Sequence, residues 1–115
     1  MTQFRPFSAT VRSANGAAII DLHGEINANA EAVLNGAYAK AVQGQPARLL
    51  LNFGDVDYIN STGIALIVGL LAQARKARIV LVTYGLNAHY QEIFKITRLA
   101  DFMGMVDDEA AALAG

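Results

Sequence analysis

The stretch Asp55-Val-Asp-Tyr-Ile-Asn60-Ser61-Thr62-Gly63-Ile64-Ala-Leu66 decides how this chain folds. The apolar residues 49–53 before it predict a buried strand, and the acidic residues predict a turn that ends this strand. A helix is expected to begin at Asn60 or Ser61, because both are good N-cap residues. Ser61 and Thr62 would then lie at an exposed helix start that tolerates negative charge, where a switch could act. Capping is the usual role of such hydroxyls, so a functional role needs other support.

The rest of the chain reads as an initial hairpin followed by alternating strands and helices. The Asn15-Gly16 pair is a strong hairpin signal and predicts that the first two strands are antiparallel. The expected strands are residues 7–12, 17–22, 48–53, 78–84 and 102–106, and the expected helices are residues 28–42, 62–75, 88–96 and 107–113. Alternation after a hairpin predicts an α/β fold, with parallel strands in a mixed sheet of four to five strands and about four packed helices.

The helix after Ser61 has two apolar sides. At about 100° per residue, the side expected to face the sheet is a stripe of four residues: Ile64, Ile67, Val68 and Leu71. The opposite side carries Leu66 and Leu70, flanked by Gly69 and Gln73, where a surface helix would normally carry charge. We interpret this side as a surface that a partner covers. The alternative is that another helix of the same domain covers the two leucines.

Composition restricts the class of protein. The chain has 115 residues, 54% hydrophobic and 17% charged, which is typical of one compact domain spanning residues 1–115. A net charge of −1 argues against nucleic-acid binding, and the cluster of Arg75, Lys76 and Arg78 is interpreted as a solvated helix end. No apolar run approaches the roughly 20 residues that span a bilayer, and no signal peptide is recognised. We therefore expect a cytoplasmic protein without a membrane span.

The residues that support catalysis or cofactor binding are absent or unpaired in the sequence. There is no cysteine, and His23 and His89 lack metal-ligand spacing. Ser61 lies in no Gly-x-Ser-x-Gly elbow, and no phosphate-binding glycine loop with lysine occurs. Glu25, Asp55 and Asp57 could be neighbours across the strand ends, but carboxylates there are usually only solvated. We expect no catalytic residue, no metal, no cofactor and no enzymatic activity.

Two motifs resemble the STAS family, named for sulfate transporters and anti-sigma factor antagonists. Tyr58-Ile-Asn-Ser-Thr-Gly-Ile64 is similar to the family signature, and Ile19-Ile-Asp-Leu-His-Gly-Glu25-Ile-Asn27 is similar to the family strand that ends in Gly-Glu-Leu-Asp. The resemblance extends from about Asn15 to the C-terminus and implies the STAS strand order. Asn60 and Asn27 stand where the family usually has aspartate. Asparagine keeps the shape and the capping ability of aspartate but removes its charge.

The resemblance implies an anti-sigma factor antagonist that works by partner switching in bacterial transcription. An anti-sigma factor that is also a serine kinase would bind the chain and phosphorylate Ser61, with Thr62 as the second choice, and a serine phosphatase would reset it. The implied partner surface combines the two motifs with the second side of the helix: Glu25, Asn27, Asp57, Asn60, Ser61, Thr62, Leu66, Gly69, Leu70 and Gln73.

Two other functions remain open from the sequence. The first is a non-switching scaffold of the same fold, as in stressosome-like assemblies or lipid-transport complexes, in which Asn60 and Asn27 mark the loss of regulation. The second is a small enzyme or ligand-binding domain that uses a pocket at the strand ends. Carboxylates and hydroxyls are available for it, but no base is paired with a nucleophile.

Overall fold

The sheet begins with the hairpin that the Asn15-Gly16 pair predicts. In the computed structural model, which describes residues 4–114, β1 (Ser8–Ala14) and β2 (Ala17–Ile26) pair antiparallel. The two turn residues have φ angles of 51° and 79°. Positive φ at both central positions is what a type I′ turn needs, and this turn matches the twist of the strands that it joins.

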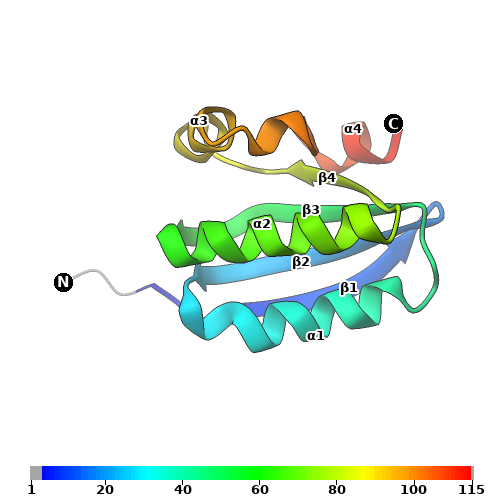
Figure 1. Ribbon diagram of the computed structural model, residues 1–115, viewed down its shortest axis with the longest axis horizontal. Coiled ribbons are helices and arrows are strands. Elements are labelled where there is room, and N and C mark those ends of the chain that lie inside the picture. The colour runs from blue at the N-terminus through cyan, green and yellow to red at the C-terminus, as the bar shows by residue number, and fades with distance from the viewer. Residues whose placement is uncertain (1–3, 115) are drawn as a thin grey trace.

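The remaining strands add to β2 in chain order and run parallel to it. The strand order is β1-β2-β3-β4-β5, so the predicted mixed α/β sheet is confirmed (Figure 1). The strands after the hairpin are β3 (Arg48–Ile59), β4 (Val80–Tyr84) and β5 (Gly104–Val106). The helices are α1 (Glu31–Val42), α2 (Ser61–Lys76), α3 (Ala88–Ile96) and α4 (Glu109–Ala114), with short 3₁₀ turns η1 (Ala28–Ala30) and η2 (Leu99–Asp101).

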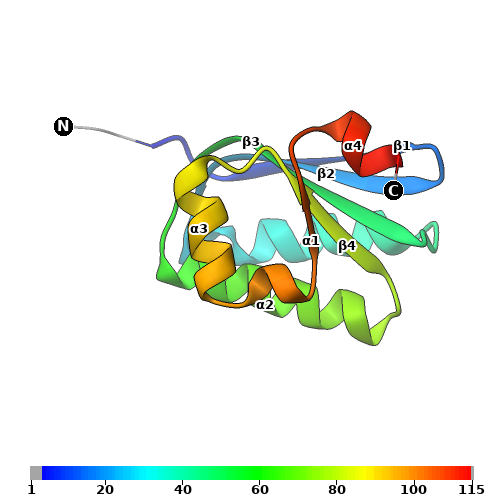
Figure 2. The same ribbon diagram turned by 90° about the horizontal axis from the view of Figure 1, so that it is seen from above.

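The sheet is covered on both faces. Figure 2 shows α1 and α2 below the sheet and α4 above it. Leu49 and Leu51 belong to the main core on the side of α1 and α2, whereas Leu50 packs in a smaller core with Ala112 of α4. Because successive residues of β3 point to opposite faces and both faces are buried there, its first part, Leu49 to Leu51, is apolar without interruption.

The third strand is longer than predicted. The acidic residues Asp55 and Asp57, expected in a turn, lie within β3, which continues to Ile59. Two register shifts against β2 interrupt its pairing, one near Gly54 and one near Asp57. Bulges of this kind bend a strand and re-aim its side chains. The acidic stretch is therefore an irregular strand end, and it brings both aspartates to the edge of the sheet from which α2 begins.

The buried side of α2 differs from the predicted one. The residues that it buries are Gly63, Ile67, Leu70, Leu71 and Ala74. Leu70 is only 1% exposed, so the expectation that it lies on an accessible surface is wrong, and Val68, expected in the core, is 45% exposed. Helix α1 lies beside α2 on the same face of the sheet, as the alternative interpretation required (Figure 1). The buried side includes the small residues Gly63 and Ala74, which contribute little to a hydrophobic pattern, so the large residues alone indicate a different stripe.

Truncation of Leu70 tests this packing directly. Leu70→Ala should lower the free energy of unfolding by about 2–5 kcal/mol, because it leaves a cavity in the core. Gln73→Ala, an exposed change on the same helix, should alter it by no more than about 0.5 kcal/mol. Urea denaturation followed by circular dichroism would measure both values. An equal, small effect of the two substitutions would contradict the burial of Leu70.

Candidate functional site

The two sequence motifs meet at the carboxyl ends of β2 and β3. In the parallel pairing of these strands, Glu25 lies opposite Tyr58 and Ile26 lies opposite Ile59. The backbone N–H of Asn60 then donates to the carbonyl of Ile26 at 3.2 Å. The fold thus brings both motifs, which are distant in the sequence, to one edge of the sheet.

The start of α2 shows which residue caps the helix. Asn60 has an extended backbone, and its side-chain Oδ1 accepts the N–H of Gly63 at 2.8 Å. Its carbonyl accepts the first helical N–H, that of Ile64, at 2.9 Å. Ser61 and Thr62 are exposed, and within residues 4–114 no hydrogen bond from either hydroxyl is found. The capping role therefore belongs to Asn60, and the Ser61 hydroxyl is free for chemistry.

The glycine of the signature is required by a close approach of backbones. A Cβ atom added to Gly63 would lie 2.0 Å from the carbonyl oxygen of Ile26 and 2.9 Å from a methyl carbon of Ile59. No larger residue fits without moving the first turn of α2 away from the end of β2. The glycine consequently sets the distance between the two motifs.

Both asparagines that replace the usual aspartates are helix caps. Asn27 precedes η1, and its Oδ1 accepts the N–H of Asn29 at 2.8 Å. Asn60 does the same for α2. An amide oxygen accepts these hydrogen bonds as a carboxylate does, so the backbone geometry needs no negative charge at either position. The replacement changes the charge of the surface, which carries up to two fewer negative charges.

The acidic pair of β3 is organised by the N-terminal segment. The guanidinium of Arg5 contacts Asp55 at 3.0 Å and Asp57 at 2.8 Å, and the backbone N–H of Arg5 also donates to Asp57, at 3.1 Å. His23 of β2 approaches Asp55 from the other side, with 2.7 Å between Nδ1 and Oδ2. One arginine thus bridges both aspartates and offsets one of their two charges.

The same segment is held by further contacts. The ring of Phe4 stacks on Tyr58 with centroids 5.1 Å apart, and the carbonyl of Arg5 accepts the N–H of Glu25 at 2.9 Å. Sequence reasoning missed Phe4, Arg5 and His23 as members of the site, because no local pattern links Arg5 to an aspartate 50 residues away. The one available signal was the pair of neighbouring carboxylates, which favours a nearby cation.

These contacts change the acidity of the aspartates. Hydrogen bonds from Arg5, and then the contact with His23, lower the pKa of Asp55 to about 2. Arg5 also lowers the pKa of Asp57 below its ordinary value. Both groups are therefore ionised over the whole physiological range of pH, and the edge of the sheet next to the helix start keeps a negative charge.

The other residues expected in the partner surface are distributed unevenly. Gly69 and Gln73 are exposed, and Glu25 and Leu66 are half-buried. Leu70, as shown above, lies in the core and cannot contact a partner while the domain is folded. The accessible part of the predicted surface is therefore the strand ends and the first turn of α2, with a small contribution from Gly69 and Gln73.

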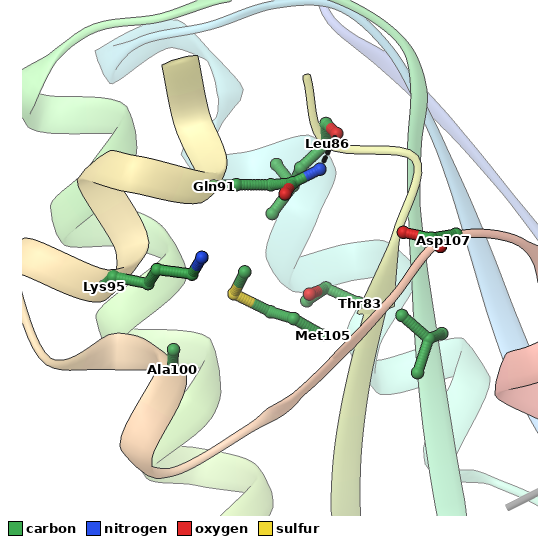
Figure 3. A pocket seen from close by; sticks show the side chains of 8 residues that line it. Thr83, Leu86, Gln91, Lys95, Ala100, Met105 and Asp107 are labelled. Atoms are coloured by element: carbon green, nitrogen blue, oxygen red, sulfur yellow. Dashed lines mark hydrogen bonds between the residues drawn. The ribbon is translucent and has the colours of Figure 1, made fainter. Parts of the chain in front are cut away.

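A separate cavity of about 310 Å³ lies between β4, β5 and α3 (Figure 3). Its polar side chains are largely committed to the backbone: the Gln91 amide donates to the carbonyl of Leu86 at 2.8 Å, and the Thr83 hydroxyl donates to that of Gly104 at 3.1 Å. Lys95 and Asp107 lie on opposite sides of the opening (Figure 3). This lining pairs no nucleophile with a base, so it provides no support for catalysis in this cavity.

Residues 4–114 contain neither a metal-binding cluster nor a membrane-spanning helix. In that part of the chain no three His, Cys, Asp or Glu side chains gather closely enough to hold a metal ion. None of the helices described there combines the length and the apolar character needed to cross a membrane.

Comparison with known proteins identifies relatives of this chain. The family model for the STAS domain matches residues 8–112. BtrV of Bordetella bronchiseptica, whose name describes it as a candidate anti-sigma factor antagonist, is 31% identical over 106 residues, which cover 91% of this chain and 90% of BtrV.

Solved structures of other proteins have the same fold as this chain. An anti-sigma factor antagonist from Mycobacterium paratuberculosis superposes with a TM-score of 0.81 at 16% identity, covering 95% of this chain and 92% of the other. The Bacillus cell fate determinant SpoIIAA in its phosphorylated form superposes with a TM-score of 0.68 at 18% identity, covering 93% of this chain and 96% of the other. At these identities the likeness establishes the shared fold.

Two glycines of α2 provide a matched test of the helix start. Gly63→Ala should cost at least about 2 kcal/mol of unfolding free energy, because its methyl group collides with the carbonyl of Ile26. Gly69→Ala should stabilise the protein by about 0.5–1 kcal/mol, because that helical position is exposed and has open space around it. Thermal or urea unfolding measures both. Stabilisation by Gly63→Ala would show that α2 does not approach β2 this closely.

The Arg5 bridge predicts a pH-dependent contribution to stability. Because the pKa of Asp55 is lower in the folded protein than its ordinary value of 3.8, the bridge stabilises the fold above about pH 4. This contribution is lost as the pH falls toward about 2. Arg5→Ala should therefore lower the melting temperature at pH 7, and the difference from the wild type should shrink steadily below pH 4 and vanish as the pH falls through about 2.

Lys40→Ala serves as the control for this series, since it removes an exposed cation for which no ion pair is found within residues 4–114. It should change the melting temperature little at any pH. A difference between wild type and Arg5→Ala that stays constant from pH 7 to pH 2 would argue against the bridge.

Proposed function

The chain belongs to the STAS domain family, and on this premise we propose that it acts as an anti-sigma factor antagonist that is switched by phosphorylation of Ser61. The observation that carries the proposal is the free, exposed hydroxyl of Ser61 at the start of α2, where Asn60 already supplies the cap. A modification of Ser61 would not remove a hydrogen bond on which the helix depends. The domain would therefore remain folded in both states.

The proposed partner is an anti-sigma factor that is also a serine kinase and uses its own ATP. It would contact the strand ends and the first turn of α2, a surface that includes Glu25, Asn27, Asp57 and Thr62. A serine phosphatase would then remove the phosphate and restore binding. In this scheme the chain itself carries out no reaction and needs no cofactor. The phosphorylated form described for SpoIIAA, a protein of the same fold, supports the proposal.

The electrostatics of the site explain how one phosphate could release the partner. Phosphorylation adds about −1.5 to −2 charges, which the N-terminus of a helix tolerates. In an interface, the same charge must be stripped of water, and it also meets the ionised Asp55 and Asp57. Because Arg5 and the neutral Asn60 reduce the local negative charge, we infer that loss of hydration contributes more to release than repulsion does.

Substitution of the two hydroxyl residues tests the proposal. With the cognate kinase and ATP, Ser61→Ala should abolish phosphate incorporation, whereas Thr62→Ala should retain it, because Ser61 matches the family serine. Peptide mass spectrometry locates the phosphate, and isothermal titration measures binding of the anti-sigma factor. Phosphorylation should weaken this binding by about tenfold or more, since it places a charge within the interface.

The alternatives predict different results in the same experiment. A non-switching scaffold would bind its partner without any phosphate appearing on Ser61 or Thr62. Phosphate found only on Thr62 would assign the switch to the neighbouring residue. Binding that is unchanged after full phosphorylation of Ser61 would contradict the proposed switch.

A further inference from the structure

An apolar groove runs along the C-terminal half of α2, where the segment after α3 lies beside it (Figure 2). It encloses about 270 Å³. Eight residues line it: Val68, Leu71, Ala72, Arg75, Thr97, Arg98, Leu99 and Phe102. The proposed function makes no use of this surface, which lies at the end of α2 opposite Ser61.

The groove leaves large apolar side chains in contact with water. Val68 is 45% exposed and Phe102 is 52% exposed, while Leu71 and Leu99 form a buried floor between them. The guanidinium of Arg75 lies 4.6 Å from the centroid of the Phe102 ring, so a cation–π contact holds this ring in an exposed position. Burying these side chains under a partner would remove apolar surface from water and favour binding.

Positive charge is concentrated in the part of the sequence that forms the groove. Residues 67–102 contain five of the nine lysine and arginine residues of the chain but only two of its ten acidic residues. Arg75 and Arg98 line the groove itself, and Lys76 and Arg78 lie within three positions of Arg75 in the sequence. Arg98 pairs with Asp101 at 2.7 Å, whereas no ion pair of Arg75 is found within residues 4–114. The groove therefore offers a positive rim that carboxylates can approach.

We propose that this groove binds an acidic, amphipathic segment of a partner protein. Apolar side chains of the segment lie on Leu71, Leu99 and the Phe102 ring, and its carboxylates contact Arg75 and Arg98. A lipid surface fits less well, because membrane-binding elements present a convex apolar face, whereas this apolar surface is recessed. A peptide segment that inserts into a groove matches the shape.

The groove and the proposed switch can be occupied at the same time. Ser61 and Arg75 are fourteen residues apart on one helix, which corresponds to about 21 Å along its axis. A phosphate at Ser61 is therefore separated from the charge of Arg75 by more than the screening length of about 8–10 Å at physiological salt. Partner binding at the groove should therefore be independent of phosphorylation, and it would give the chain a second attachment point.

Selection from a displayed library of random 12-residue peptides tests this proposal without knowledge of the natural partner. Peptides are selected on the 115-residue protein and counter-selected on its Phe102→Ser variant. The enriched sequences should combine Asp or Glu with Leu or aromatic residues three or four positions apart. Synthetic versions, labelled with a fluorophore, should bind with an affinity that falls as salt is raised, because the rim is charged.

Matched substitutions distinguish binding at the groove from nonspecific effects of changing a surface residue. Phe102→Ser and Arg75→Glu should each weaken binding of the selected peptide by about tenfold or more. Val33→Ser alters an equally accessible apolar residue of α1, 42% exposed, and Lys40→Glu alters an exposed cation of the same helix. Both controls should leave binding unchanged. Melting temperatures of all four variants confirm that they are folded.

Three results would overturn the proposal. The first is a selection in which no acidic consensus emerges, and the second is equal binding of the selected peptides to wild type and Phe102→Ser. The third is binding to vesicles of phosphatidylglycerol, lost in Arg75→Glu, without binding to any acidic peptide, which would assign the groove to a membrane surface. Peptide binding that survives phosphorylation of Ser61 and is lost in Phe102→Ser would support a site separate from the switch.

Discussion

The arrangement of the site depends on one close contact, between the first turn of α2 and the end of β2. Gly63 lies so near the carbonyl of Ile26 that no side chain fits between them, and the N–H of Asn60 donates to the same carbonyl. This contact fixes where the helix begins and in which direction its N-terminus points. The exposure of Ser61 and the proximity of the two motifs both follow from it.

A balance of charges is built around that helix start. Asp55 and Asp57 supply negative charge, Arg5 offsets part of it, and the capping asparagines contribute none. The geometry of the helix cap therefore does not depend on a negative charge, since an asparagine amide accepts the backbone hydrogen bond as well as an aspartate carboxylate would. Under the proposed function, an added phosphate would act mainly through loss of hydration. The opposite end of α2 carries the cations Arg75 and Lys76.

Leu70, the acidic stretch and Arg5 differ from the expectations for physical reasons. The hydrophobic pattern places Leu70 outside the core because large residues dominate it, whereas the small Gly63 and Ala74 are also buried and Gly63 closely approaches Ile26. The acidic stretch was interpreted as a turn because charged residues are rare in regular strands, but bulges accommodate them at a strand end. Arg5 was missed because its partners are distant in the sequence.

The sequence by itself determined the hairpin, the alternation of strands and helices, and a helix that starts near Ser61, because turn residues, periodicity and capping act over a few neighbouring positions. It also determined the family, through two motifs whose residues are constrained locally. Only the tertiary structure decided that Asn60 rather than Ser61 is the cap, that Arg5 bridges the aspartates, and which side of α2 is buried. Those outcomes depend on contacts between segments that are far apart in the chain. The geometry of such contacts cannot be inferred from a local sequence pattern.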